Sequence, residues 1–155
     1  MHTVDKGLVY IIGQRPEAVS AYVDVVFSNE AARRSRYGFA VFMAGCLISC
    51  LSKCTTMVCL STSEAEFVVA TETAKDVVWD RGFLDELGFL TSVPSVIRED
   101  NQVCCHDCQP FCFVAKSPFY SENVVVHDGV ITFAFVPSKR NIADIFTKVI
   151  PDVKG

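Results

Sequence analysis

Residues 60–70 constrain this chain most, because they open the strongest helical pattern in the sequence. Ser61 and Glu64 stand at the spacing of a capping box, and Ser63 with Glu66 repeats that spacing. Apolar residues then recur at helical spacing as far as Gly88, where a left-handed C-terminal residue is expected. The apolar stripe consists of Phe67, Ala70, Ala74, Val77, Leu84 and Leu87. This pattern predicts one long helix, and Glu66 should stand at the edge of the surface on which it packs.

Short β-forming runs lie on both sides of this helix. Three runs precede it and two follow it, namely residues 21–27, 37–43, 47–52, 95–100 and 130–136. Three consecutive strands predict an antiparallel meander, and the long helix permits a crossover to a fourth strand parallel to the first. A final short helix is predicted over residues 142–148, with Asn141 as its cap. The chain is therefore expected to fold as an α/β (α+β mixed) domain.

Size and charge narrow the class of protein. The chain has 155 residues, half of them hydrophobic, which suits one folded domain and excludes disorder. A net charge of −4 disfavours holding nucleic acid by charge alone, but it is compatible with an acidic site neutralised by metal. No apolar run approaches the ~18 residues of a membrane span, and no signal peptide is visible. We therefore expect no membrane association and an intracellular, cytoplasmic location.

The eight cysteines allow two interpretations. Cys104, Cys105, Cys108 and Cys112 could supply metal-ligand spacing, and Cys46, Cys50, Cys54 and Cys59 form a looser series. Neither series shows the two tight pairs of a typical zinc site, and a reducing compartment disfavours disulfides. We expect free, mostly buried thiols and no disulfides; a zinc-binding interaction module over residues 104–112 is the alternative.

Four acids fall on four separate predicted elements. Asp24 lies inside the first strand, Glu66 starts the long helix, Asp100 ends the fourth strand and Asp144 starts the last helix. An acid inside a buried strand is costly unless it is paired or bound to metal. Carboxylates that meet at one sheet edge can hold two divalent ions about 4 Å apart, as a phosphodiester nuclease requires. On the helix alone Glu66 reads more simply as a cap, so the set of four carries this hypothesis.

The sequence resembles the ribonuclease H domain at the end of the Pol polyprotein of copia-type LTR retrotransposons. The matching stretches are residues 21–24, 33–38, 60–67, 99–102, 136–137 and, most specifically, the Ala-Asp-Ile-Phe-Thr-Lys of residues 143–148. The resemblance runs from about residue 7 to 151. It implies that residues 1–15 are a remnant of the link from reverse transcriptase and that residues 16–151 form the ribonuclease H-like domain.

This resemblance implies a fold, an activity and a set of partners. The fold would be ribonuclease H-like, a five-stranded mixed sheet flanked by helices. The activity would be metal-dependent endonucleolytic cleavage of the RNA strand of RNA–DNA hybrids during reverse transcription, with two Mg²⁺ ions for which Mn²⁺ can substitute. The partners would be the hybrid and the reverse transcriptase domain of the parent polyprotein, within a virus-like particle in an intact element.

Site residues carry over by motif. Asp24, Glu66, Asp100 and Asp144 would be the catalytic and metal-binding carboxylates, which moves Glu66 from cap to ligand. Residues expected to contact nucleic acid are Arg33, Arg34, Arg36, Asn101, Gln102, Lys139 and Arg140.

The sequence also departs from the family pattern. The family has Asp-Ala-Asp-Trp where this chain has Asp24-Val-Val-Phe27, so a second acid and an indole are missing. The family's Lys-His-Ile segment should fall near Lys116, and neither His106 nor His127 matches its histidine. These losses are typical of a diverged copy and predict impaired activity. The alternative is a catalytically inactive, folded remnant that keeps hybrid binding.

Overall fold

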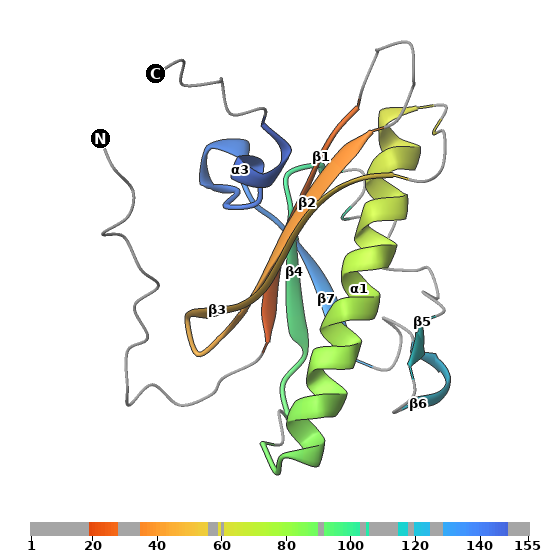
Figure 1. Ribbon diagram of the computed structural model, residues 1–155, viewed down its shortest axis with the longest axis vertical. Helices are drawn as coiled ribbons and strands as arrows, with labels where there is room; N and C mark the ends of the chain where they lie inside the picture. The colour runs from red at the N-terminus through yellow and green to blue at the C-terminus, as the bar shows by residue number, and fades with distance from the viewer. Residues whose placement is uncertain are drawn as a thin grey trace.

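A five-stranded mixed sheet organises the chain, with helices on both of its faces (Figure 1). The computed structural model describes residues 19–27, 35–55, 59, 61–89, 92–102, 105, 115–117, 120–124 and 129–148. The strands of the sheet are β1 (Ser20–Val26), β2 (Arg36–Met43), β3 (Cys46–Cys54), β4 (Ser95–Glu99) and β7 (Ile131–Phe135). Their spatial order is β3-β2-β1-β4-β7.

Strand direction follows the predicted connections. β1, β2 and β3 form an antiparallel meander, with Ala44 and Gly45 at positive φ in the turn between β2 and β3. The long helix α1 (Thr62–Glu86) then carries the chain to β4, which pairs parallel to β1, and β7 pairs parallel to β4. The predicted meander and parallel fourth strand are confirmed, and the chain is a mixed α/β protein with a five-stranded mixed sheet.

The two ends of α1 lie at the residues that were predicted to begin and end the helix, Ser61 and Gly88. The Ser61 hydroxyl accepts the N–H of Glu64 at 3.1 Å, as a capping residue should. Gly88 adopts φ +81°, and its N–H donates to the carbonyl of Asp85 at 2.9 Å. The N–H of Phe89 donates to the carbonyl of Leu84 at 2.8 Å, which completes the C-terminal motif.

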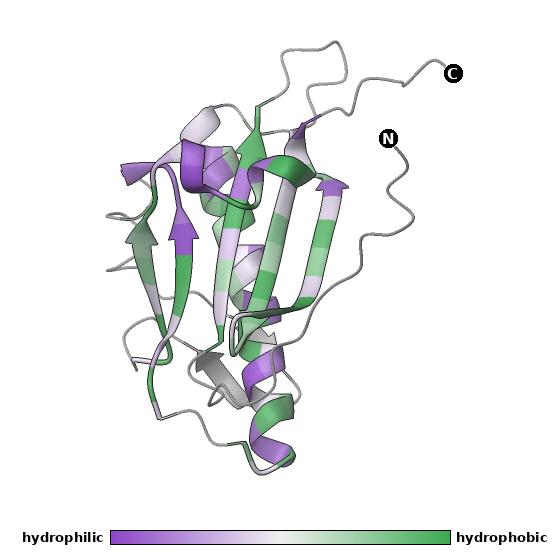
Figure 2. Cartoon of the chain, turned by 90° about the vertical axis from the view of Figure 1, so that its left-hand side faces the viewer, coloured by the Kyte–Doolittle hydropathy of each residue, from purple (hydrophilic) through white to green (hydrophobic). Residues whose placement is uncertain are grey.

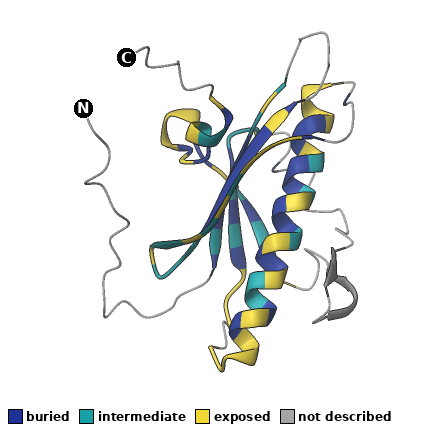
Figure 3. Ribbon diagram, viewed as in Figure 1, coloured by how far each residue is buried: buried dark blue, intermediate teal, exposed yellow. Residues whose placement is uncertain are grey.

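The core lies between α1 and one face of the sheet. Alternate residues of β1 and β2 face the helix because side chains of a strand point to opposite sides in turn. The buried cluster includes Val19, Ala21, Val23, Phe39, Val41, Val69, Ala70, Ala74, Val77, Val78 and Ile97. Figure 3 shows this buried face of α1 turned toward the sheet and its exposed face turned away.

The buried stripe of α1 is rotated from the predicted one. Phe67 and Leu87, expected in the stripe, are exposed, whereas Glu66 and Thr73 are buried within it. Apolar residues occur on both sides of this helix, so periodicity alone could not identify the face that packs. Glu66 therefore heads the stripe that lies on the sheet, instead of standing just before it.

Besides β7, four described elements follow β4. A hairpin of β5 (Ala115–Ser117) and β6 (Tyr120–Val124) lies beside α1, in a segment for which no element was predicted (Figure 1). The 3₁₀ turn η3 (Ser138–Arg140) and the short helix α3 (Asp144–Thr147) follow β7. Figure 2 shows α3 crossing the sheet face opposite α1. None of the described helices is long and apolar enough to cross a membrane.

The thiols are less buried than expected. Cys59 and Cys105 are buried, but Cys50 and Cys54 are exposed and Cys46 is intermediate. The three exposed or partly exposed thiols belong to β3, and one face of this edge strand lies outside the core. None of the five described cysteines is in a disulfide. Cys104, Cys108 and Cys112 lie outside the described residues.

One carboxyl on α1 makes the fold sensitive to pH. Burial, and next the charge of Asp76 one turn away, raise the pKa of Asp80 from 3.8 to about 6. A raised carboxyl pKa means that the folded state disfavours the charged form. This destabilisation is absent below pH 3.8, grows as the pH rises, and reaches its full size above about pH 6.

Asp80→Asn should therefore stabilise the protein at alkaline pH. We expect the free energy of unfolding at pH 8 to rise by about 1–2 kcal/mol, after discounting the shift for solvent screening of a partly exposed group. The gain should shrink as the pH falls below about 6. Urea denaturation across this range measures it, with exposed Asp85→Asn on the same helix as the control. An equal gain at every pH would contradict the assignment.

Candidate active site

The four predicted carboxylates lie at one edge of the sheet. β1, β4 and β7 are parallel, so their carboxyl ends share an edge, where α1 also begins (Figure 1). Tyr22 pairs with Arg98, and continuing that register by two residues brings Asp24 level with Asp100. Glu66 reaches this edge from the first turns of α1, and Asp144 reaches it as the first residue of α3. The topology thus brings together four acids that are far apart in the sequence.

The charges of these acids act on one another. Burial is the largest influence on Asp24 and raises its pKa; the nearby charges of Asp100 and Asp144 raise it further. Burial also raises the pKa of Glu66, and the charges of Asp100 and Asp24 add to that. Asp24 and Glu66 are each only 8% exposed. Burial is therefore the larger cause of both raised pKa values, and the neighbouring carboxylate charges add to it.

Asp24 is held by the last turn of the described chain. The hydroxyl of Thr147, a buried residue of α3, donates a hydrogen bond to the Asp24 carboxylate. This hydroxyl also lies 3.1 Å from the carbonyl oxygen of Asp144. Hydrogen bonding to Thr147 lowers the pKa of Asp24 and so partly offsets the effect of burial. Thr147 therefore links the first and the fourth predicted carboxylate residues.

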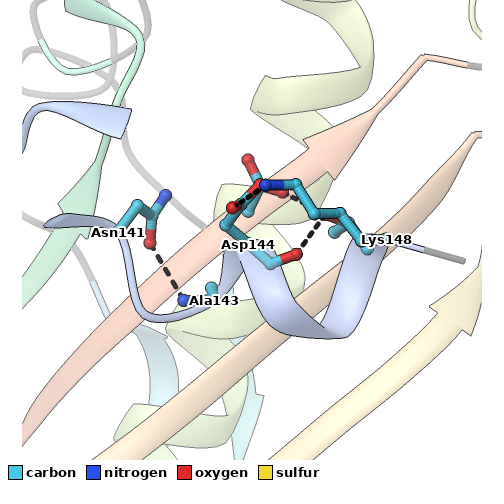
Figure 4. Close-up of polar contacts among 6 residues, drawn as sticks. Asn141, Ala143, Asp144 and Lys148 are labelled. Atoms are coloured by element: carbon cyan, nitrogen blue, oxygen red, sulfur yellow. Dashed lines mark hydrogen bonds and ion pairs between the residues drawn. The ribbon is translucent and has the colours of Figure 1, made fainter. Parts of the chain in front are cut away.

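Asn141 attaches the same segment to the sheet. Its side-chain amide donates to the carbonyl of Val23 at 2.8 Å, and its carboxamide oxygen accepts the N–H of Ala143 at 3.1 Å (Figure 4). The predicted cap was wrong in position, since the helix begins at Asp144 and its N-cap residue, Ala143, has no side-chain cap. The Asn141 side chain instead bonds Val23 and Ala143, two residues before the actual N-cap position, and so joins residues 141–143 to β1.

A glycine on β2 makes room for α3. Gly38 pairs with Asp24 across β1 and β2. A Cβ added at Gly38 would overlap Cβ of Phe146 in α3, well inside van der Waals contact. The Ser52 hydroxyl on β3 also donates to the carbonyl of Phe146, at 2.5 Å. Only glycine at position 38 lets α3 lie this close to the sheet and beside Asp24.

Glu66 has a protein partner from the end of β4. The side-chain amide of Asn101 donates a hydrogen bond to the Glu66 carboxylate and lowers its pKa. The Glu66 carboxylate therefore reaches across to the sheet edge, as expected of a site residue and not of a cap. Asn101 was expected to contact nucleic acid, and here it orients a predicted ligand.

Two charged residues of the site were missed from the sequence. Lys148 forms an ion pair with the Asp144 carboxylate, its side chain folded back over α3 (Figure 4). Glu99, at the end of β4, is fully buried, and its carboxylate accepts the N–H of Asp100 at 3.0 Å. Lys148 could have been found because it lies four residues after Asp144, the spacing at which helical side chains pair. Glu99 could have been found because side chains alternate along a strand, and its position falls on the buried side of β4.

The donors suit a divalent cation, although they do not converge on one point. Carboxylate oxygens are the hard ligands that Mg²⁺ prefers. Among the described residues, no three of His, Cys, Asp and Glu lie close enough together to hold an ion. The carboxylates of Asp24, Glu66 and Asp144 are instead hydrogen-bonded to Thr147, Asn101 and Lys148. Metal binding would require these side chains to turn toward a common point.

The residues expected to contact nucleic acid are only partly described. Arg36 is exposed at the start of β2, Gln102 is exposed after β4, and Lys139 and Arg140 are exposed in η3. Since η3 follows β7, these two cations lie at the same sheet edge as the acids. Arg33, Arg34, His106 and His127 lie outside the described residues.

The sequence is similar to part of a much longer protein. It is 30% identical over 131 residues to the Retrovirus-related Pol polyprotein from transposon TNT 1-94 of Nicotiana tabacum. The match covers 77% of this chain but only 9% of that relative. No protein-family model matches the sequence, and no solved structure matches it.

Gly38→Ala should release α3 from the sheet. We expect a loss of about 1–3 kcal/mol in the free energy of unfolding, because the added methyl overlaps Phe146. We also expect faster tryptic cleavage at Lys139, Arg140 and Lys148, because local opening frees the backbone around these exposed side chains to enter the protease. Gly129→Ala is the control for destabilisation away from α3: nothing lies within 4 Å of its added Cβ, and its cost is backbone strain at φ +70°. Equal tryptic rates in both variants would contradict this docking.

Thr147→Val should destabilise the metal-free protein in a pH-dependent way. Removing the hydroxyl leaves the buried Asp24 carboxylate without this donor, which should cost about 1–3 kcal/mol. The loss should be larger at pH 8 than at pH 5, because the hydrogen bond favours the charged carboxylate. Urea denaturation in EDTA measures it, and Thr147→Ser, which keeps the hydroxyl, should recover most of the loss. Val and Ser variants of equal stability at pH 8 would refute the role.

Proposed function

We propose that this chain, whose similarity to a Pol polyprotein supports an origin in a retrotransposon Pol polyprotein, is a ribonuclease H domain that cleaves the RNA strand of RNA–DNA hybrids. The observation that carries the proposal is that acids from four separate elements lie at one sheet edge, where the carboxyl ends of β1 and β4 meet the starts of α1 and α3. Burying and crowding carboxylates reduces stability, and such perturbed groups are typical of functional sites. The order of strands and helices is consistent with the ribonuclease H-like fold that the sequence implied.

Two divalent metal ions, Mg²⁺ or Mn²⁺, would activate water and stabilise the leaving oxygen when bound. In this proposal Asp24, Glu66, Asp100 and Asp144 supply the oxygen ligands. Thr147 and Asn101 fix the starting orientations of Asp24 and Glu66. Such supporting hydrogen bonds limit how far a ligand must move, which matters because metal sites depend on oriented side chains.

Substrate binding would rely on a few cations around an acidic edge. Arg36, Lys139 and Arg140 are exposed on elements that end or begin there, and Gln102 offers a neutral polar contact. With a net charge of −4, the chain gains little general attraction for phosphates. Hybrid binding should therefore weaken steeply with salt. The reverse transcriptase domain of the parent polyprotein, acting in a virus-like particle, would hold the hybrid in place during reverse transcription.

A second candidate is a catalytically inactive domain that binds hybrids. The observation that favours it is the engagement of three carboxylates with Thr147, Asn101 and Lys148, with no ready ion-holding group among the described residues. The missing histidine of the family points the same way, since an acid–base group contributes typically 10²–10⁴-fold. Hybrid cleavage separates the two candidates.

We expect slow, metal-dependent cleavage of a labelled RNA–DNA hybrid, strongest at low salt and abolished by EDTA. Asp100→Asn, which keeps the shape but removes ligand charge, should lower the rate by at least about 100-fold. Asp85→Asn is the control, because Asp85 is an exposed acid at the far end of α1. If Asp100→Asn cleaves as fast as the parent, the activity comes from a contaminant. A parent that binds hybrid but does not cleave it with Mg²⁺ or Mn²⁺ would favour the inactive binder.

A further inference from the structure

Lys148 carries a positive charge at the edge of the acidic site. Its ammonium group forms an ion pair with the carboxylate of Asp144, four residues earlier. The Lys148 side chain is 69% exposed, against 38% for that of Asp144. The ammonium therefore lies on the solvent side of the carboxylates, which is the side from which a substrate must approach.

The backbone of Lys148 is fixed, whereas its side chain is exposed and held only by a surface ion pair. Asn141 and Thr147 attach residues 141–147 to β1, and Gly38 lets α3 pack against β2. The N–H of Lys148 donates to the carbonyl of Asp144 at 3.3 Å, which places this residue at the end of α3. An exposed ion pair contributes only about 0–1 kcal/mol, so its ammonium can exchange readily for another anion.

We infer that Lys148 is a substrate-binding residue whose ammonium moves from Asp144 to a phosphate of the strand held at the site. This inference rests on the proposed function. When Asp144 gives its oxygens to a divalent ion, Lys148 loses its partner and lies beside the position that a backbone phosphate must take. A lysine ammonium is a mobile point charge with three donors, which suits a phosphate oxygen.

A simpler role for Lys148 would be to neutralise Asp144. A double-mutant cycle separates the two roles, because neutralisation has no effect once Asp144 is uncharged. In an Asp144→Asn background, Lys148→Met should still weaken hybrid binding if the ammonium contacts phosphate. It should have no effect if the ammonium serves only the carboxylate.

The chain offers a matched control in Lys75. Lys75 forms an exposed ion pair with Glu72 at 2.6 Å, three residues apart on α1. It lies roughly 14 Å along the helix from Glu66, at a rise of about 1.5 Å per residue. Lys75→Met therefore removes the same charge from a similar surface pair away from the site.

The experiment measures anisotropy of a labelled RNA–DNA hybrid in EDTA, where cleavage is blocked, over a series of salt concentrations. In the Asp144→Asn background we expect Lys148→Met to weaken binding about three- to tenfold and to reduce the slope of log K against log salt by about 0.9. Lys148→Arg should keep most of the affinity, and Lys75→Met should change neither quantity. Circular dichroism melts of each variant check that it is folded.

Two results would overturn the inference, and they are distinguishable. If Lys148→Met binds like its Asp144→Asn background while the parent binds hybrid, Lys148 only neutralises Asp144 and the proposed function stands. If the folded parent has no affinity for the hybrid at low salt, the proposed function fails and this inference fails with it.

Discussion

The site depends on the close approach of α3 to the sheet. Gly38 provides the space, Asn141 binds the carbonyl of Val23, and Thr147 reaches Asp24. Each contact joins the end of the described chain to β1 or β2, which stand near its beginning. Without this docking Asp144 and Lys148 would not reach the sheet edge, and Asp24 would be a buried carboxylate lacking a hydrogen-bond donor from α3. A buried charge of that kind is strongly destabilising, so the same contacts support both the fold and the site.

The carboxylates have opposite effects on stability and on function. Burial and mutual repulsion raise the pKa values of Asp24 and Glu66, so their charged forms destabilise the folded protein at neutral pH. Thr147, Asn101 and Lys148 each offset part of this through a hydrogen bond or an ion pair. Divalent cations would offset it more fully by supplying positive charge among the acids. A protein that had no use for these acids would be more stable with neutral residues there, which is the physical argument for a metal-dependent role.

The similarity to a Pol polyprotein and the geometry of the site support different conclusions about this protein. The similarity to a Pol polyprotein from a plant transposon covers most of this chain but only 9% of the relative, so it supports an origin and leaves the activity to be tested. The structure contributes the shared sheet edge, the coupling of the acids and the partners of each carboxylate. Under the proposed ribonuclease H function, the lack of a second acid after Asp24 and of a matching histidine predicts slow cleavage. The nuclease and the inactive hybrid binder share the same fold and differ only in whether the carboxylates can turn onto metal.

The sequence by itself determined the elements with strong local signals. The caps of α1 at Ser61 and Gly88, the three-strand meander and the parallel fourth strand followed from hydrogen-bonding residues, alternation and connection length, all of which act over short distances. The motif residues Asp24, Glu66, Asp100 and Asp144 were also found from the sequence. Only the tertiary structure decided which face of α1 is buried, because Phe67 and Leu87 are as apolar as the residues that pack. It also decided what Asn141, Thr147 and Asn101 contact, since hydrogen-bond partners separated by up to 123 residues depend on how the strands are ordered and paired. Local sequence carries no information about that distant pairing, and for this reason the partners of Asp24 and Glu66 could not be predicted.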